Sequence, residues 1–299
     1  MEFTFNGVIP EEINFNGNWL ERVKCNGVTV WEKYDPVGTT LKLTSIGNST
    51  VALQGPYDTD ITYVPDIKYS LDGGNTWTEW HYEVDNVAQR HYDVLPLSDG
   101  EFVLIKGDNR HGWDQNHYTY FVMTGNITAS GNIMGLLDNG ACTSRTIPCK
   151  ECFRLLFKDC SALTSIDGLL LPATTLADSC YHSMFTGCSS LTTVPQNLLP
   201  ATTLTSGCYF YMFEMCTSLT TAPILPAETL LPSCYEGMFY RCSSLSNVVC
   251  KAIDVSAHLC TEKWLQLVSS TGTFVKNASM NDWTRDGNGI PSGWTVQNE

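Results

Sequence analysis

A nine-residue cysteine motif that recurs at nearly constant spacing constrains this chain more than any other feature. The pattern Cys-Tyr-x-x-Met-Phe-x-x-Cys occurs at 180–188, 208–216 and 234–242, and residues 152–160 form a variant copy. With Cys260 counted as the start of a fifth copy, the first cysteines are 28, 28, 26 and 26 residues apart. A period of this length is typical of a chain whose coils stack on one another.

Within each copy, the spacing predicts a short helix. Cysteine, methionine, phenylalanine and the second cysteine lie at i, i+4, i+5 and i+8, so they share one face of about two helical turns. The segment that follows, such as 190–195, alternates apolar and hydroxyl residues and ends in proline, which favours a short strand. We therefore predict a leucine-rich-repeat solenoid of strand, turn and helix units. Its predicted repeating core consists of Cys152, Cys160, Cys180, Cys188, Cys208, Cys216, Cys234, Cys242, Phe157, Phe185, Phe213 and Phe239.

The cysteine columns have a simple interpretation as packed, reduced thiols, because cysteine is a small residue that is usually buried. Disulfides are a second interpretation. Cys149 and Cys152 also have the Cys-x-x-Cys spacing of zinc sites, but Cys152 already belongs to a repeat column. We predict no metal and no cofactor.

Residues 1–36 are predicted to form short strands joined by Asn-Gly turns. Residues 22–31 carry the strongest hairpin signal, because both residues of the Asn26-Gly27 pair tolerate positive φ. Two interpretations are open: these hairpins dock the chain to a partner or to its own copies, or they belong to the next domain.

Residues 37–128 alternate apolar and polar runs between Gly, Pro, Asn and Asp clusters, which predicts an antiparallel β-sandwich. Residues 70–77 match the pattern S-x-D-x-G-x-T-W. We expect Asp72 to accept backbone hydrogen bonds, Gly74 to take positive φ and Trp77 to cover the turn. The pattern resembles the Asp-box of sialidase propellers, where it is structural, so it implies no catalytic residue.

The loop 108–118 is the first candidate binding segment. Trp113 and Tyr118 could stack on a sugar, while His111, Asp114 and His117 could bind a divalent metal. A polar surface loop with one buried tryptophan is the third interpretation.

The repeats are assigned to residues 129–271, with an N-terminal cap at 133–137. The pattern decays after Cys250, and residues 272–299 are predicted to fold over the last coil as a capping hairpin that carries Trp283 and Trp294. The predicted fold class is mixed α+β, with a β-sandwich followed by a capped leucine-rich-repeat solenoid.

Charge and motifs exclude several functions. A net charge of −14 argues against binding a nucleic-acid backbone, which requires clustered lysine and arginine. The first residues lack the features of a secretory signal, and no apolar run is long enough to insert into a membrane. The chain has no GxxxxGK[ST], GxGxxG, HExxH or GxSxG motif, so we predict no enzymatic activity.

Several phrases resemble the BspA-like leucine-rich-repeat proteins of gut Bacteroidales and their bacteriophages. They are Cys-Ser-Ser-Leu-Thr-Thr (188–193), Leu-Pro-Ala-Thr-Thr-Leu (199–204), Ser-Gly-Asn-Ile-Met (130–134) and Gly-Ile-Pro-Ser-Gly-Trp-Thr-Val (289–296). Residues 23–33 are similar to a hairpin near the ends of phage tail and fibre proteins. The resemblance implies adhesion or virion attachment, with no catalytic residues to carry over.

We therefore expect a non-enzymatic virion structural protein, a head or tail fibre or a surface decoration, assembled in the bacterial cytoplasm. The N-terminal segment would contact other virion proteins, and the repeats would bind a host-surface protein or glycan. The resemblance implies a homotrimer or another homo-oligomer. The alternative is a Bacteroidales cell-surface adhesin or a carbohydrate-binding module. Variable repeat positions such as His182 and Glu236 are expected at the surface, and the apolar ones, Phe210, Tyr211 and Tyr240, are candidate binding residues.

Overall fold

The chain divides into two compact units, Met1–Gly38 and Thr39–Glu299. The computed structural model describes residues 13–15, 18–20, 22–25, 28–32, 40–57, 65–85, 89–110, 119–281 and 283–299. In the first unit, β1 (Ile13–Phe15) pairs antiparallel with β2 (Asn18–Leu20), and β3 (Arg22–Cys25) pairs antiparallel with β4 (Val28–Glu32). The hairpin predicted for residues 22–31 is present as β3 and β4.

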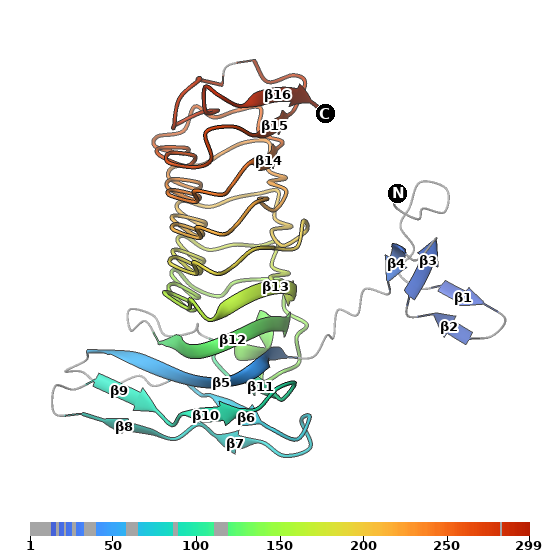
Figure 1. Cartoon of the computed structure of the whole chain (residues 1–299), viewed down its shortest axis with the longest axis vertical. Helices are drawn as coiled ribbons and strands as arrows, with labels where there is room; N and C mark the ends of the chain where they lie inside the picture. The colour runs from blue at the N-terminus through green and yellow to red at the C-terminus, as the bar shows by residue number, and fades with distance from the viewer. Residues whose placement is uncertain are drawn as a thin grey trace. The chain divides into compact units, whose positions relative to one another are not determined.

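Two long strands organise the start of the second unit. β5 (Leu41–Tyr57) and β12 (Tyr120–Asn132) pair antiparallel along most of their lengths, as Figure 1 shows. Gly47 in β5 and Gly125 in β12 have φ of 78° and 81°, and the register shifts beside Gly125. A side chain at Gly125 would lie only 2.9 Å from the Cα of Ser49, so glycine allows the two strands to bend together.

Six short strands, together with β13 (Leu163–Leu170) from the repeats, complete one nine-stranded sheet around this pair. Along the edge of β5 opposite β12, the partner changes from β11 to β10 and then to β9, so the sheet curls. These short strands are β6 (Lys68–Ser70), β7 (Thr78–Glu79), β8 (Tyr82–Val84), β9 (Gln89–Tyr92), β10 (Leu95–Leu97) and β11 (Phe102–Lys106).

The predicted sandwich is therefore wrong, because the structure has a single curled, largely antiparallel sheet instead of two packed sheets. Alternation of apolar and polar residues shows that a strand has one buried face, but it does not show which strands pair. β12 also continues past position 128, where the sequence analysis ended the sandwich. It pairs in parallel with β13 (Leu163–Leu170), the first strand of the repeats.

The repeats form coils that lie one above another on β12, visible as successive layers in Figure 1. The first coil rests directly on this strand, because the ring of Phe121 stacks on Phe157 with centroids 5.1 Å apart. The predicted cap at 133–137 is instead a buried turn that packs against β5 and β11, η1 (Ile133–Leu136). Asn132 begins this 3-10 turn, and its side chain accepts a hydrogen bond from the N–H of Met134.

The predicted helices are absent from the described residues, and the mixed α+β leucine-rich-repeat assignment is wrong. Of the residues, 32% are in strands and 2% are helical, so the regular secondary structure is nearly all β. In the second coil, Ser179, Ser183 and Gly187 have φ of 55°, 51° and 73°. A left-handed residue at every fourth position interrupts a right-handed helix.

Backbone hydrogen bonds show what replaces the helix. The N–H groups of Cys180, His182 and Met184 each donate to the carbonyl three residues earlier. The residues between them, including Tyr181 and Ser183, donate instead to the next coil. Alternate N–H groups therefore close tight turns and link coils. The i, i+4, i+8 pattern of buried residues suits a helix and this ribbon of turns equally well.

Aromatic side chains form two files through the stack. Phe157, Phe185, Phe213 and Phe239 are fully buried, and neighbouring rings stack at 5.3, 5.4 and 5.6 Å with interplanar angles of 5–7°. A second file runs along the first: Phe153, Tyr181, Tyr209, Tyr235, Trp264 and Trp283. Burying rings in this way supplies the apolar stabilisation that a single coil lacks.

The second cysteine of each motif supports the phenylalanine file. The thiols of Cys160, Cys188, Cys216 and Cys242 donate to the carbonyl oxygens of Phe121, Phe157, Phe185 and Phe213 at 3.2, 3.1, 3.2 and 2.9 Å. Burial raises the pKa of each of these thiols. The other predicted core cysteines, Cys152, Cys180, Cys208 and Cys234, are also buried.

We expect these four thiols to resist alkylation in the folded protein, because the thiolate is the reactive form and burial disfavours it. Iodoacetamide labelling read by mass spectrometry should modify them only in denaturant. Ser243→Cys, which places an exposed thiol beside Cys242, is the positive control. Rapid native labelling of Cys216 would contradict the buried thiol file.

The far end of the stack is a three-stranded sheet of β14 (Asn247–Cys250), β15 (Thr273–Lys276) and β16 (Thr295–Asn298). Both pairings are parallel, so the predicted capping hairpin is not formed. Trp283 nevertheless stacks on Trp264 at 5.3 Å, and buried Trp294 donates to the carbonyl of Ser269 at 2.8 Å.

Candidate binding surface on the stacked coils

The turn segment of each coil presents two outward columns of side chains. The column two residues after the first cysteine contains Arg154, His182, Phe210, Glu236 and Glu262; the column six residues after it contains Lys158, Thr186, Glu214, Tyr240 and Gln266. Alternate N–H groups between the columns, such as those of Ser183 and Phe185, donate to the next coil, so the columns have a fixed backbone register.

The structure brings the predicted binding residues Phe210, Tyr211 and Tyr240 together. The rings of Phe210 and Tyr211 meet at 4.6 Å and 63°, and those of Tyr211 and Tyr240 meet at 6.4 Å and 85°. The imidazole of His182 packs edge-on to Phe210 at 4.7 Å. All four side chains are half-buried, and we call them the aromatic cluster. His182 occupies the same position in its repeat as Phe210 does in the next one, and this equivalence is the sequence feature that places it beside the cluster.

Gly237 makes room for the central ring. It has φ of 60°, and a Cβ atom there would lie 2.6 Å from Cδ1 of Tyr211. Glycine is therefore favoured at position 237 for two reasons: it adopts positive φ without strain, and it has no Cβ atom to collide with the Tyr211 ring.

We expect Gly237→Ala to lower the free energy of unfolding by about 1–2 kcal/mol through backbone strain and to displace Tyr211 from the cluster. In a Tyr211→Ala background the collision is absent, so only the backbone strain should remain. A double-mutant cycle from urea unfolding measures this coupling. Strict additivity would mean that Gly237 does not position the ring.

Carboxylates alter the electrostatics around the cluster. Burial raises the pKa of Tyr211, and the carboxylates of Glu236 and Glu214 raise it further. Burial also raises the pKa of Glu214, although Thr186 donates a hydrogen bond to its Oε2 at 3.1 Å. The guanidinium of Arg241 lies over the ring of Tyr240, 5.1 Å from its centroid.

His182 is held neutral at physiological pH. Burial first, and then the charge of Arg154, lower the pKa of His182 from 6.5 to about 4. The unfolded chain binds this proton at higher pH than the folded chain does, so folding stability is lost as pH falls from 6.5 towards 4.

This pH dependence can be measured by comparing the free energy of unfolding of the parent chain with that of a variant that lacks His182. We expect the free energy of unfolding to fall more steeply between pH 6.5 and 4 in the parent chain than in His182→Gln, which has no titrating group there. Urea unfolding across this range tests it, and identical slopes would contradict the lowered pKa.

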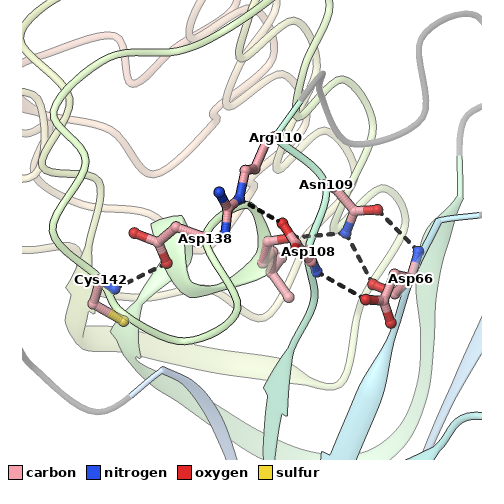
Figure 2. A network of polar contacts seen from close by, with 7 residues as sticks. Asp66, Asp108, Asn109, Arg110, Asp138 and Cys142 are labelled. Carbon is pink, nitrogen blue, oxygen red and sulfur yellow. Dashed lines mark hydrogen bonds and ion pairs between the residues drawn. The ribbon is translucent and has the colours of Figure 1, made fainter.

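The other predicted binding residues, Trp113 and Tyr118, lie outside the described residues, as do His111, Asp114 and His117 of the proposed metal set. The residues just before them form a network of hydrogen bonds. The side chain of Asn109 accepts from the N–H of Asp66 at 2.9 Å and donates to the carbonyls of Asp66 and Leu136 at 2.9 and 2.7 Å. Figure 2 shows the contacts between Asn109 and Asp66. Asp108 accepts from Arg110 at 2.8 Å.

An open pocket of about 370 Å³ lies beside this segment and includes Arg110, Asp138 and Ser144. The carboxylate of Asp138 accepts from the N–H groups of Cys142 and Thr143 at 2.9 and 3.0 Å, so it is used to hold a turn. No group of three metal-binding side chains occurs within the described ranges.

The Asp-box turn between β6 and β7 agrees with the sequence prediction. Asp72 accepts from the N–H of Thr76 at 2.9 Å, and Gly74 has φ of 94°. Hydrogen bonds from the side chain and backbone of Thr76 lower the pKa of Asp72 to about 2. Lys106 lies over the ring of Trp77 at 4.3 Å. The carboxylate is thus committed to the turn.

Comparison with protein-family models, curated proteins and solved structures finds no match for this chain. In the part of the chain that the structure describes, no helix has the length and apolar character of a membrane span. The resemblance to BspA-like and phage proteins therefore stays a prediction.

Proposed function

We propose that this chain is a non-enzymatic attachment protein of a bacteriophage virion, acting as a head or tail fibre or a surface decoration that binds a host surface. The aromatic cluster is the observation that carries the attachment role. Phe210, Tyr211 and Tyr240 are half-exposed, whereas the phenylalanine, tyrosine and tryptophan rings of the two files in the repeats are buried. Large, partly exposed aromatic side chains are the residues that most often anchor protein interfaces.

The backbone beneath the cluster supports this role. The carbonyl of Phe210 accepts from the N–H of Ser183 at 2.8 Å, and the N–H of Tyr211 donates to the main-chain carbonyl of Glu236 at 2.9 Å. Both cluster residues are thus joined to neighbouring coils. A surface held in one conformation loses less entropy on binding than a flexible loop does.

Display on a particle would multiply weak contacts. The N-terminal hairpin formed by β3 and β4 belongs to a separate compact unit, and this unit is the proposed attachment to other virion proteins. A homotrimer or other homo-oligomer would present several aromatic clusters to one cell. Effective concentration then raises the overall affinity without any new contact.

Two measurements test the proposal. Mass spectrometry of purified phage particles should detect this chain, and its absence would refute the virion assignment. The labelled full chain should bind Bacteroidales cells, and the triple variant Phe210→Ala, Tyr211→Ala, Tyr240→Ala should bind about tenfold more weakly or worse.

Phe102→Ala is the control for cell binding. Phe102 is a half-buried ring on β11 with Lys42 over its face, away from the repeats. The Phe102→Ala variant should bind cells as tightly as the parent chain does. Unchanged binding of the triple variant would show that the aromatic cluster is not the attachment surface.

A further inference from the structure

Carboxylates and aromatic rings alternate on the stacked coils. In one outward column Phe210 is followed by Glu236 and Glu262, and in the other Glu214 is followed by Tyr240. The main chain joins these neighbours directly: Tyr211 donates to Glu236, and Gly237 donates to Glu262 at 2.8 Å. The carboxylates of Glu236, Glu214 and Glu262 all act on the hydroxyl of Tyr211, so the central ring of the cluster lies among them.

These carboxylates form no ion pair within the described residues, although the charge of Arg241 acts on Glu214 from beyond ion-pair distance. Glu214 accepts from the hydroxyl of Thr186, and Glu262 accepts from the amide of Asn288 at 2.7 Å. None of the described ion pairs contains Glu214, Glu236 or Glu262, although Arg241 and Lys263 occur on the same turns. A cation from a partner would meet unpaired negative charge.

One ring of the cluster, that of Tyr240, already contacts a cation within the chain. Arg241 lies over the face of Tyr240, a geometry in which the negative face of an aromatic ring attracts a positive charge. Phe210 and Tyr211 have no such cation over their rings in the described part of the chain. A guanidinium or ammonium group placed there would contact a ring face and a carboxylate together.

We propose that this surface, the aromatic cluster with Glu214, Glu236 and Glu262, binds a basic protein segment that presents several arginine or lysine side chains. The inference rests on the proposed attachment function and adds the chemistry of the partner. Three carboxylates on three successive coils favour several cations on one chain over a single small ligand. The net charge of −14 would also steer such a segment towards the protein.

The test uses hexa-arginine and hexa-lysine peptides and measures their affinity for the full chain by calorimetry. The triple variant Glu214→Gln, Glu236→Gln, Glu262→Gln should bind about tenfold more weakly or worse, as should the aromatic triple variant. Added salt should weaken parent binding. Hexa-glutamate and a neutral hexasaccharide should not bind.

A matched control separates this surface from general attraction to an acidic protein. The variant Glu83→Gln, Asp167→Asn, Glu228→Gln removes the same number of charges from exposed positions outside the surface. It should change affinity by less than about twofold. Equal losses in both glutamate variants, absence of peptide binding, or binding of the neutral hexasaccharide would overturn the inference.

The cell-binding assay distinguishes the two proposals. If the aromatic triple variant loses cell binding while the glutamate triple variant retains it, the basic partner is wrong but the attachment role stands. If both variants bind cells normally, both proposals fail. Urea unfolding midpoints of all variants confirm that each chain is folded.

Discussion

Replacing Phe213 with alanine is expected to lower the free energy of unfolding by about 3–5 kcal/mol. Its ring is fully buried between Phe185 and Phe239, with centroids 5.4 and 5.6 Å away. Removal leaves a cavity in the middle of the file, and the hydrogen-bonded coils on either side restrict its collapse. Because each coil contacts only its neighbours, the defect divides the stack at this level.

Phe210→Ala provides the control on the same coil. Phe210 is half-exposed, so its removal should cost less than about 1 kcal/mol, although it should weaken binding. Urea unfolding followed by far-ultraviolet circular dichroism measures both variants. The Phe213 variant should also show a broader transition, as the two halves of the stack uncouple. Equal stability of the two variants would contradict the role assigned to the phenylalanine file.

Replacing Asn109 with leucine is expected to lower the free energy of unfolding by about 3 kcal/mol or more, since one unpaired buried polar group costs about 1–3 kcal/mol. Only 3% of Asn109 is exposed. Its side chain forms hydrogen bonds with the N–H and the carbonyl of Asp66 and with the carbonyl of Leu136. Leucine has similar size but satisfies none of these groups.

Arg110→Ala tests whether the loss is specific to that network. Arg110 is exposed and pairs with Asp108 at the surface, so its removal should change stability by less than about 1 kcal/mol. Thermal unfolding by calorimetry compares the two variants. A loss below about 0.5 kcal/mol for Asn109→Leu would mean that water replaces the amide without cost.

Side-chain burial was predictable over much of the repeat region. Phe185 and Cys188 recur in register with Phe213 and Cys216, and a recurring apolar residue can be buried only against its counterpart in the next coil. The Asp-box turn was equally local, because Ser70, Asp72 and Gly74 make its interactions within a few residues. The Asn26-Gly27 hairpin followed from the same short-range rule.

Hydrogen-bond partners were not predictable in the same way. The spacing of Cys180, Met184 and Cys188 is compatible with a helix, whose bonds lie within one segment. In the structure, Tyr181 and Phe185 instead bond to Cys208 and Met212 in the next coil. The choice depends on a neighbouring coil being present to accept those bonds, so no single copy of the motif contains the information.

The candidate surface shows the same division. Phe210, Tyr211 and Tyr240 could be chosen from sequence because apolar residues occupied variable positions of the repeat. Their alternation with Glu236 and Glu214, and the space that Gly237 leaves for Tyr211, depend on how residues about one repeat apart are aligned.

The amino-acid sequence by itself thus determined the repeat length and which side chains are buried, because both follow from recurring apolar positions. Three-dimensional packing decided that the motif forms left-handed turns, that β12 belongs to both sheet and stack, and that β15 and β16 run in parallel. Burial is a property of individual residues, whereas strand pairing and turn geometry require the partner that accepts each hydrogen bond.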